Sequence, residues 1–155
     1  MSETDDLPAG MAAIVDDFRS VSERERLQLL LEFSRELPAL PARLEGHRDT
    51  MEPVVECQAP VFLLVEVDPH DAVHLFFEAP AEAPTTRGFA GILREGLEGL
   101  TVGQVLGVPD DVPERLGLSA AVSPLRLRGM AGMLARIKRQ VREKQAAGHA
   151  PLTEQ

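Results

Sequence analysis

The stretch at residues 61–78, VFLLVEVDPHDAVHLFFE, decides the fold. Its first part, residues 61–67, is β-branched and apolar, which is typical of a buried strand. Its last part, residues 72–78, alternates between two faces with the period of two that a strand requires. Residues 68–71 (DPHD) supply turn-forming side chains between them, so we predict an antiparallel hairpin. Residues 54–55 (VV) form a further short extended piece, which gives a predicted sheet of about three strands.

Helical patterns precede the hairpin. Residues 11–19 place apolar side chains on one face and predict a first short helix. Ser22 and Glu25 form a capping box, in which both side chains accept hydrogen bonds from backbone N–H groups at the start of a second helix. Pro38 and Pro41 end that helix. Its predicted apolar stripe consists of Leu27, Leu30, Leu31 and Leu37, with Ser34 between them.

Helical patterns also follow the hairpin. Residues 85–97 form a predicted helix with three glycines, each about 1 kcal/mol less favourable there than alanine. We expect these glycines to allow close packing against the sheet. Thr101 is predicted to cap a short helical turn, and Ser123 with Pro124 begins a long C-terminal helix that ends near Gly148. The three glycines are Gly88, Gly91 and Gly96, and the long helix has an apolar stripe of Leu127, Met130, Leu134, Ile137 and Val141.

The order of these elements predicts an α+β fold, with a small antiparallel sheet flanked by N-terminal and C-terminal helices. The chain has 155 residues, of which 44% are hydrophobic, so a single domain is expected. We place that domain at residues 11–147. Residues 1–10 are expected to be disordered and residues 148–155 to be frayed.

Composition excludes several classes of function. The net charge of −9 disfavours binding to nucleic acid or to an anionic membrane. The chain has neither the apolar run of a spanning helix nor a signal peptide, so we expect a cytoplasmic protein. One cysteine, Cys57, excludes an internal disulfide framework and a cysteine-only metal site within one chain. We predict no bound cofactor or metal, and a monomer or weak homodimer.

Basic residues are concentrated in the predicted C-terminal helix. Residues 126–144 contain seven Lys or Arg and one acidic residue. The interpretation that we favour is a solvated outer face, formed by Arg136, Lys138, Arg139, Arg142 and Lys144. A nucleic-acid site is less well supported, because no aromatic residues alternate with these charges. A third interpretation, a docking surface for an acidic partner, is supported less well than the solvated face and better than the nucleic-acid site.

Cys57 lies in the segment ECQAP, directly before the most hydrophobic strand. A free cysteine is most often a small buried hydrophobic residue. A loop that leads into a rigid strand is also a good place for a reactive side chain. The polar and proline neighbours favour such a loop, and on these residues alone the two interpretations are equally supported.

Two further kinds of site have little support. A cysteine hydrolase needs a histidine within hydrogen-bond reach of the thiol, and no family signature surrounds His47, His70 or His74. A metal site could use Asp68, His70, Asp71 and His74. Positions 70 and 74 would, however, lie about 13 Å apart on a strand that rises roughly 3.3 Å per residue.

Four segments together resemble the SufE family, the sulfur-acceptor proteins that work with a cysteine desulfurase in iron–sulfur cluster assembly. Their order and spacing are more specific than any one of them, and they span most of the chain. They are LPALP at residues 37–41, VECQ at 55–58 followed by VFL at 61–63, the region 77–88, and SPLR at 123–126 with Gly129.

This resemblance implies a SufE- and IscU-like fold and a role for each site residue. Cys57 would accept persulfide sulfur from a group II, SufS-like cysteine desulfurase, enhance its activity and relay the sulfur to an iron–sulfur scaffold. Such a protein has no independent turnover and uses no cofactor. Glu56, Gln58, Glu82 and Arg126 would contact the partner. The alternative is an adaptor domain of the same fold in which Cys57 is structural.

The chain departs from the family pattern around the cysteine. Glu56 stands where the family usually has glycine, which removes backbone freedom and adds a negative charge beside the thiol. Ala59 and Pro60 follow, and Phe62 replaces a tryptophan. We therefore expect the thiol to be protonated in the free protein and turned toward apolar side chains, and to be activated by the partner or by Arg126. We expect Arg126 otherwise to pair with Glu82 or Asp49.

Overall fold

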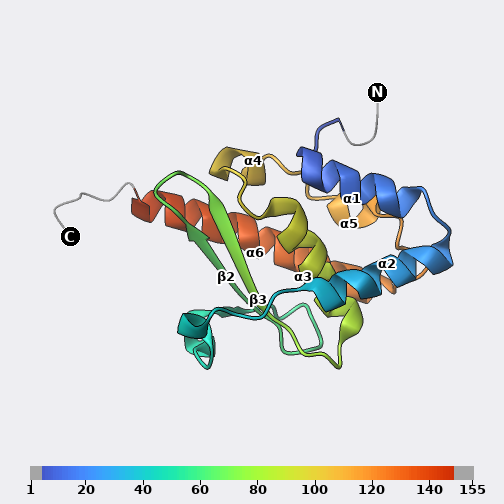
Figure 1. Ribbon diagram of the computed structural model, residues 1–155, viewed down its shortest axis with the longest axis horizontal. Helices are drawn as coiled ribbons and strands as arrows, with labels where there is room; N and C mark the ends of the chain where they lie inside the picture. The colour runs from blue at the N-terminus through green and yellow to red at the C-terminus, as the bar shows by residue number, and fades with distance from the viewer. Residues whose placement is uncertain (1–4, 149–155) are drawn as a thin grey trace.

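The computed structural model, which describes residues 5–148, contains a three-stranded antiparallel sheet in the order β1-β2-β3 (Figure 1). The predicted hairpin is confirmed, because β2 (Phe62–Val67) pairs with β3 (Val73–Glu78) in a register that sets Val65 opposite Leu75. The third strand is β1 (Glu52–Pro53), two residues before the predicted one.

The shift of the third strand has a local cause. The Val54 N–H donates a hydrogen bond to the Val61 carbonyl (2.9 Å), which closes a loop beyond the paired residues. Val54 turns into the core, whereas Val55 is 75% exposed. The predicted strand at residues 54–55 is therefore wrong, since these residues begin the loop that carries Cys57.

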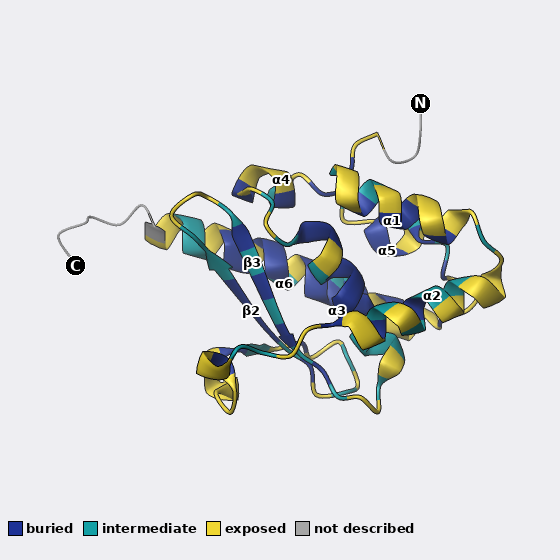
Figure 2. Ribbon diagram, viewed as in Figure 1, coloured by how far each residue is buried: buried dark blue, intermediate teal, exposed yellow. Residues whose placement is uncertain are grey.

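Helices cover one face of the sheet and build the core with it (Figure 2). Before the sheet come α1 (Ala9–Arg19) and α2 (Glu23–Glu36), followed by two short 3-10 turns at Ala42–Leu44 and Arg48–Thr50. After it come α3 (Pro84–Leu97), α4 (Val102–Leu106), α5 (Val112–Arg115) and α6 (Pro124–Gly148). The long helix α6 packs along β2, and α3 lies between α6 and the N-terminal helices. The predicted α+β class is confirmed.

The N-terminal helices follow the sequence pattern with small differences. Helix α1 begins two residues earlier than predicted, and Leu7 before it is buried. The capping box of Ser22 and Glu25 is present at the start of α2. Leu27 is 37% exposed, contrary to prediction, because the face of α2 that packs on α3 is centred on Leu30.

The glycines of α3 allow close packing, but not against the sheet as predicted. A Cβ atom at Gly88 would lie 2.5 Å from the Leu30 carbonyl oxygen, and one at Gly91 would lie 2.4 Å from that of Phe33. A Cβ atom at Gly96 would lie 2.5 Å from Met11. These glycines therefore let α3 approach α2 and α1 rather than the sheet.

Helix α6 begins as predicted, with the Arg126 N–H donating to the Ser123 hydroxyl (3.3 Å). Its predicted apolar stripe is buried. The prediction that Lys138 belongs to a solvated face is wrong, because it is buried and its ammonium group binds the Val108 carbonyl and the Asp110 carboxylate. No helix within residues 5–148 is long and apolar enough to cross a membrane.

Candidate functional site

The loop between β1 and β2 holds Cys57 against the core. The Cys57 N–H donates a hydrogen bond to the Val54 carbonyl (3.1 Å), which makes a tight turn directly before the cysteine. The side chain of Cys57 is half-buried and packs on the main hydrophobic cluster. The thiol is therefore turned toward apolar side chains in this structure, as expected.

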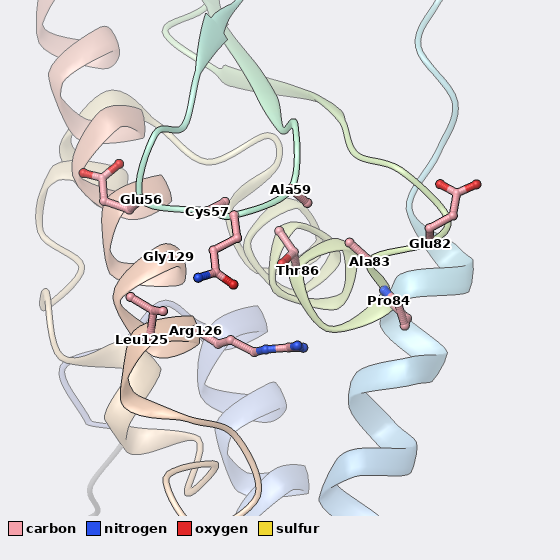
Figure 3. Close-up of a pocket in the computed structure, with 11 residues that line it drawn as sticks. Glu56, Cys57, Ala59, Glu82, Ala83, Pro84, Thr86, Leu125, Arg126 and Gly129 are labelled. Carbon is pink, nitrogen blue, oxygen red and sulfur yellow. The ribbon is translucent and has the colours of Figure 1, made fainter.

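A cavity of about 230 Å³ opens beside this loop (Figure 3). Three segments line it: the cysteine loop, the residues that lead into α3, and the first turns of α6. The structure brings all five predicted site residues into this lining, namely Glu56, Cys57, Gln58, Glu82 and Arg126. The other lining residues are Ala59, Ala83, Pro84, Thr86, Leu125 and Gly129.

The environment of Cys57 favours the protonated thiol. The pKa of Cys57 is raised to about 11, chiefly by burial and to a lesser degree by the negative charge of Glu56, while the positive charge of Arg136 acts in the opposite direction. A reactive cysteine normally needs a lowered pKa, because the thiolate is the nucleophile. The free protein therefore holds a sulfur atom that is positioned at a cavity but not activated.

Gly129 on α6 makes room for the sulfur atom. A Cβ atom at this position would lie 3.0 Å from Cys57 Sγ and 3.8 Å from the Glu56 carbonyl oxygen. The distance to the sulfur is shorter than an ordinary van der Waals contact, so a larger residue would have to displace the thiol. Gly129, which follows the SPLR segment at residues 123–126, thus allows α6 and the cysteine loop to approach closely.

Replacing Gly129 with alanine tests this contact. We expect the methyl group to push Cys57 outward and to raise its rate of alkylation by several-fold. Alanine is also favoured over glycine inside a helix by up to about 1 kcal/mol, so we expect no loss of stability. Gly103→Ala is a suitable control, because nothing lies within 4 Å of a Cβ atom there. Equal alkylation rates for wild type and Gly129→Ala would show that the loop yields without exposing the sulfur.

Arg126 and Glu82 lie at the cavity but do not pair. The Arg126 side chain extends from α6 toward the start of α3, whereas the carboxylate of Glu82 points away from it (Figure 3). Within residues 5–148, the Arg126 guanidinium makes neither a hydrogen bond nor an ion pair. The expected pairing of Arg126 with Glu82 or Asp49 is therefore wrong, and an unpaired cation lies at the cavity instead.

The carboxylate of Glu56 is bound by Arg136, which was expected on a solvated face. Arg136 on α6 lies 2.8 Å from Glu56, and only 17% of its side chain is exposed. These two residues are 80 positions apart in the chain. Because a contact of this kind leaves no local pattern, only the fold reveals Arg136 as a part of the cysteine environment.

The histidines within residues 5–148 lie outside the cavity lining. The ring of His74 is held between the carboxylates of Asp68 (2.8 Å) and Glu98 (2.6 Å), and both raise its pKa. The cavity lining contains no histidine among the described residues. Among residues 5–148, no imidazole of the cavity lining is therefore placed to take the thiol proton, as a cysteine hydrolase would require. Within residues 5–148, no group of three or more His, Cys, Asp or Glu residues is arranged to hold a metal ion.

Comparison with known proteins connects this geometry to one family. The family model described as "SufE: Fe-S metabolism associated domain" matches residues 12–141. An uncharacterized SufE-like protein of Mycobacterium tuberculosis is 56% identical over 137 residues, which cover 88% of this chain and 94% of that protein. The SufE-like protein 1 of Arabidopsis thaliana, described as chloroplastic/mitochondrial, is 28% identical over 84% of this chain and 34% of its own length.

A solved structure agrees with the fold. The solution structure of a hypothetical protein from Thermus thermophilus is 38% identical to this chain. It matches with a TM-score of 0.79 over 90% of this chain and 98% of its own. The fold is thus shared by a solved protein of almost the same extent.

Proposed function

The chain belongs to the SufE family of iron–sulfur metabolism, and from this premise we propose that Cys57 accepts persulfide sulfur from a cysteine desulfurase. The protein then relays the sulfur to an iron–sulfur scaffold. It acts as a carrier and as an activator of the desulfurase, and has no turnover of its own. We place this exchange in the cytoplasm, where a reducing environment keeps a lone thiol free.

One observation carries the proposal. The single cysteine of the chain lies at a cavity that also contains Glu56, Gln58, Glu82 and Arg126. A lone cysteine suits a carrier, because no second thiol of the same chain can convert its persulfide into a disulfide. The half-burial of Cys57 also suits a carrier, since it protects the sulfur between encounters.

The reaction is a thiol–persulfide exchange that needs no added oxidant. The Cys57 thiolate attacks the outer sulfur of the donor persulfide, and a new S–S bond forms on Cys57. The S–S bond of the donor breaks, and its electron pair stays on the donor cysteine, which leaves as a thiolate. The proton released by Cys57 can be taken up by that thiolate, so the exchange is balanced in electrons and protons.

Activation must come from the complex, because the thiol of the free protein is protonated. Moving Cys57 out of its apolar contacts into the donor site removes the burial that raises its pKa. Arg126 lies at the cavity with its charge unpaired among the described residues, so it is available to a thiolate, a persulfide anion or a carboxylate of the partner.

Mass spectrometry tests the proposal directly. The purified protein is incubated with a cysteine desulfurase, pyridoxal phosphate and free cysteine, and intact masses are then compared. We expect a gain of about 32 Da, the mass of one sulfur atom, on Cys57. No gain in mass would contradict the proposal.

A second function is favoured by the same pKa. A thiol that is half-buried, with a pKa of about 11, also fits an adaptor domain in which Cys57 only fills space. Such a protein would bind the desulfurase without taking up sulfur. The mass measurement, combined with a binding assay, separates the adaptor from the carrier.

Arg126→Ala tests the docking role of the unpaired cation. We expect a two- to fivefold weaker stimulation of the desulfurase, which is about the effect of one exposed charge contact. The stimulation that remains should also depend less on salt concentration. The melting temperature should stay nearly unchanged, because Arg126 is exposed. Arg128→Ala is the matched control, since Arg128 is exposed on the same helix but does not line the cavity. Equal losses in both variants would indicate general electrostatics rather than a contact of Arg126.

A further inference from the structure

Arg136 connects the cysteine loop to helix α6 at three points. One guanidinium nitrogen, Nη1, lies 2.8 Å from both carboxylate oxygens of Glu56. The Nε–H donates to the Pro53 carbonyl (3.3 Å) and lies 3.1 Å from the Glu52 carboxylate. Arg136 thus binds both the strand that enters the loop and the residue directly before Cys57.

The guanidinium of Arg136 is itself held in place. Glu52, its second carboxylate partner, also binds Arg139 and accepts a hydrogen bond from the Gln140 side chain (2.9 Å). Gln140 is buried and accepts a hydrogen bond from the Val65 N–H of the central strand. Because the network fixes Arg136 before Glu56 arrives, pairing costs less side-chain entropy than at an ordinary surface ion pair.

Two glycines let the loop lie flat on α6. A Cβ atom at Gly132 would lie 2.8 Å from the carboxylate carbon of Glu56, and Gly129, one turn earlier, makes room for Cys57 Sγ. The two loop residues that occupy these places are adjacent in sequence. A contact that fixes Glu56 therefore also fixes the position of its neighbour, Cys57.

We infer that the Glu56–Arg136 ion pair is a latch that holds the cysteine loop against α6 and keeps Cys57 withdrawn until a partner opens it. In this role Arg136 is a positioning residue, because it binds Glu56 and does not touch the reacting sulfur atom of Cys57. The inference rests on the proposed function for its biological meaning, since a carrier must release the loop to deliver Cys57. Opening the latch separates side chains and leaves the hydrogen bonds between β2 and β3 intact.

Removal of Arg136 would change the alkylation rate of Cys57 in opposite directions, depending on whether its charge or its role as a latch dominates. As a nearby cation it lowers the pKa of Cys57, so its removal alone would decrease thiolate formation and slow alkylation. As a latch it keeps the thiol buried, so its removal would expose Cys57 and accelerate alkylation. The sign of the change in rate decides between the two.

The first experiment compares Arg136→Met with wild type in the free protein. The rate of alkylation of Cys57 by iodoacetamide is followed at pH 8 by intact mass. We expect an increase of about fivefold, the population shift that follows the loss of one such ion pair. An unchanged or slower rate would overturn the inference. Arg139→Met is the matched control, because Arg139 belongs to the same network and binds Glu52 but not Glu56.

Gly132→Ala is the second variant, and it changes no charge. The added methyl group displaces the Glu56 side chain from α6, while alanine favours the helix, so this variant covers the case in which Arg136→Met fails to fold. We expect faster alkylation here too, and no further increase when Arg136→Met is added. Independent, multiplying effects would contradict a shared latch. None of these measurements uses a desulfurase, so a failure of sulfur transfer would be distinguished from a failure of the latch.

Discussion

Cys57→Ser abolishes the gain of sulfur mass completely while the protein stays folded. The hydroxyl oxygen occupies nearly the same space as the sulfur, and the residue is only half-buried in a loop, so we expect a stability change below about 1 kcal/mol. A serine hydroxyl at neutral pH cannot perform the exchange, because it does not form the soft anionic nucleophile that attacks a persulfide. The expected loss is therefore all or none, and intact mass after incubation with the desulfurase measures it.

Two controls make this result decisive. The melting temperature of Cys57→Ser shows whether the fold survives, and a large decrease would assign Cys57 to the structural core. Because the chain has no other cysteine, a variant that still gains one sulfur would show that some other group carries it. Binding of the variant to the desulfurase should persist, since the docking surface around the loop is unchanged.

Helices and strands could be predicted from the sequence wherever a local pattern of residues specifies them. The hairpin follows from a period of two on both sides of a turn, and the capping box of Ser22 and Glu25 marks the start of α2. Helix α5 (Val112–Arg115) was not predicted, because four residues are too few to show a helical period.

Tertiary partners could not be predicted in the same way. The glycines at 88, 91 and 96 indicate a close approach, but a glycine does not specify the surface that approaches it, and here that surface belongs to α2 and α1. Lys138 looks like a solvated cation from its residue type, yet the fold places the Val108 carbonyl beside its ammonium group. Long-range contacts of this kind depend on how the helices pack.

The candidate site was predicted in part for a similar reason. Motif resemblance was enough to select Cys57, Gln58, Glu82 and Arg126, and the structure brings them to one cavity. Resemblance could not select Arg136, because the residue that it binds, Glu56, is itself a departure from the family pattern. The contact between Glu56 and Arg136 can thus be recognised only in the folded structure.

The alkylation rate of Cys57 in the free protein should still be rising at pH 9 and 10. A thiol with an ordinary pKa of 9.0 approaches its maximal rate near that pH, whereas a pKa of about 11 delays the maximum by roughly two pH units. At pH 7 the thiolate fraction is then about 100-fold below that of an ordinary thiol. The greater nucleophilicity of a more basic thiolate recovers about tenfold of this, which leaves a rate about tenfold lower.

The matched control for this pH profile is the same protein unfolded in urea, where Cys57 loses both its burial and its fixed distance from Glu56. We expect the unfolded chain to react about tenfold faster than the folded protein at pH 7 and its rate to level off near pH 9. Linkage gives an independent check, because the unfolded state loses the thiol proton first as the pH rises. The free energy of unfolding should therefore fall between pH 9 and 11 in wild type, and this contribution should be absent in Cys57→Ser. A folded-state rate that levels off at or below pH 9 would show that the thiol is already activated before any partner binds.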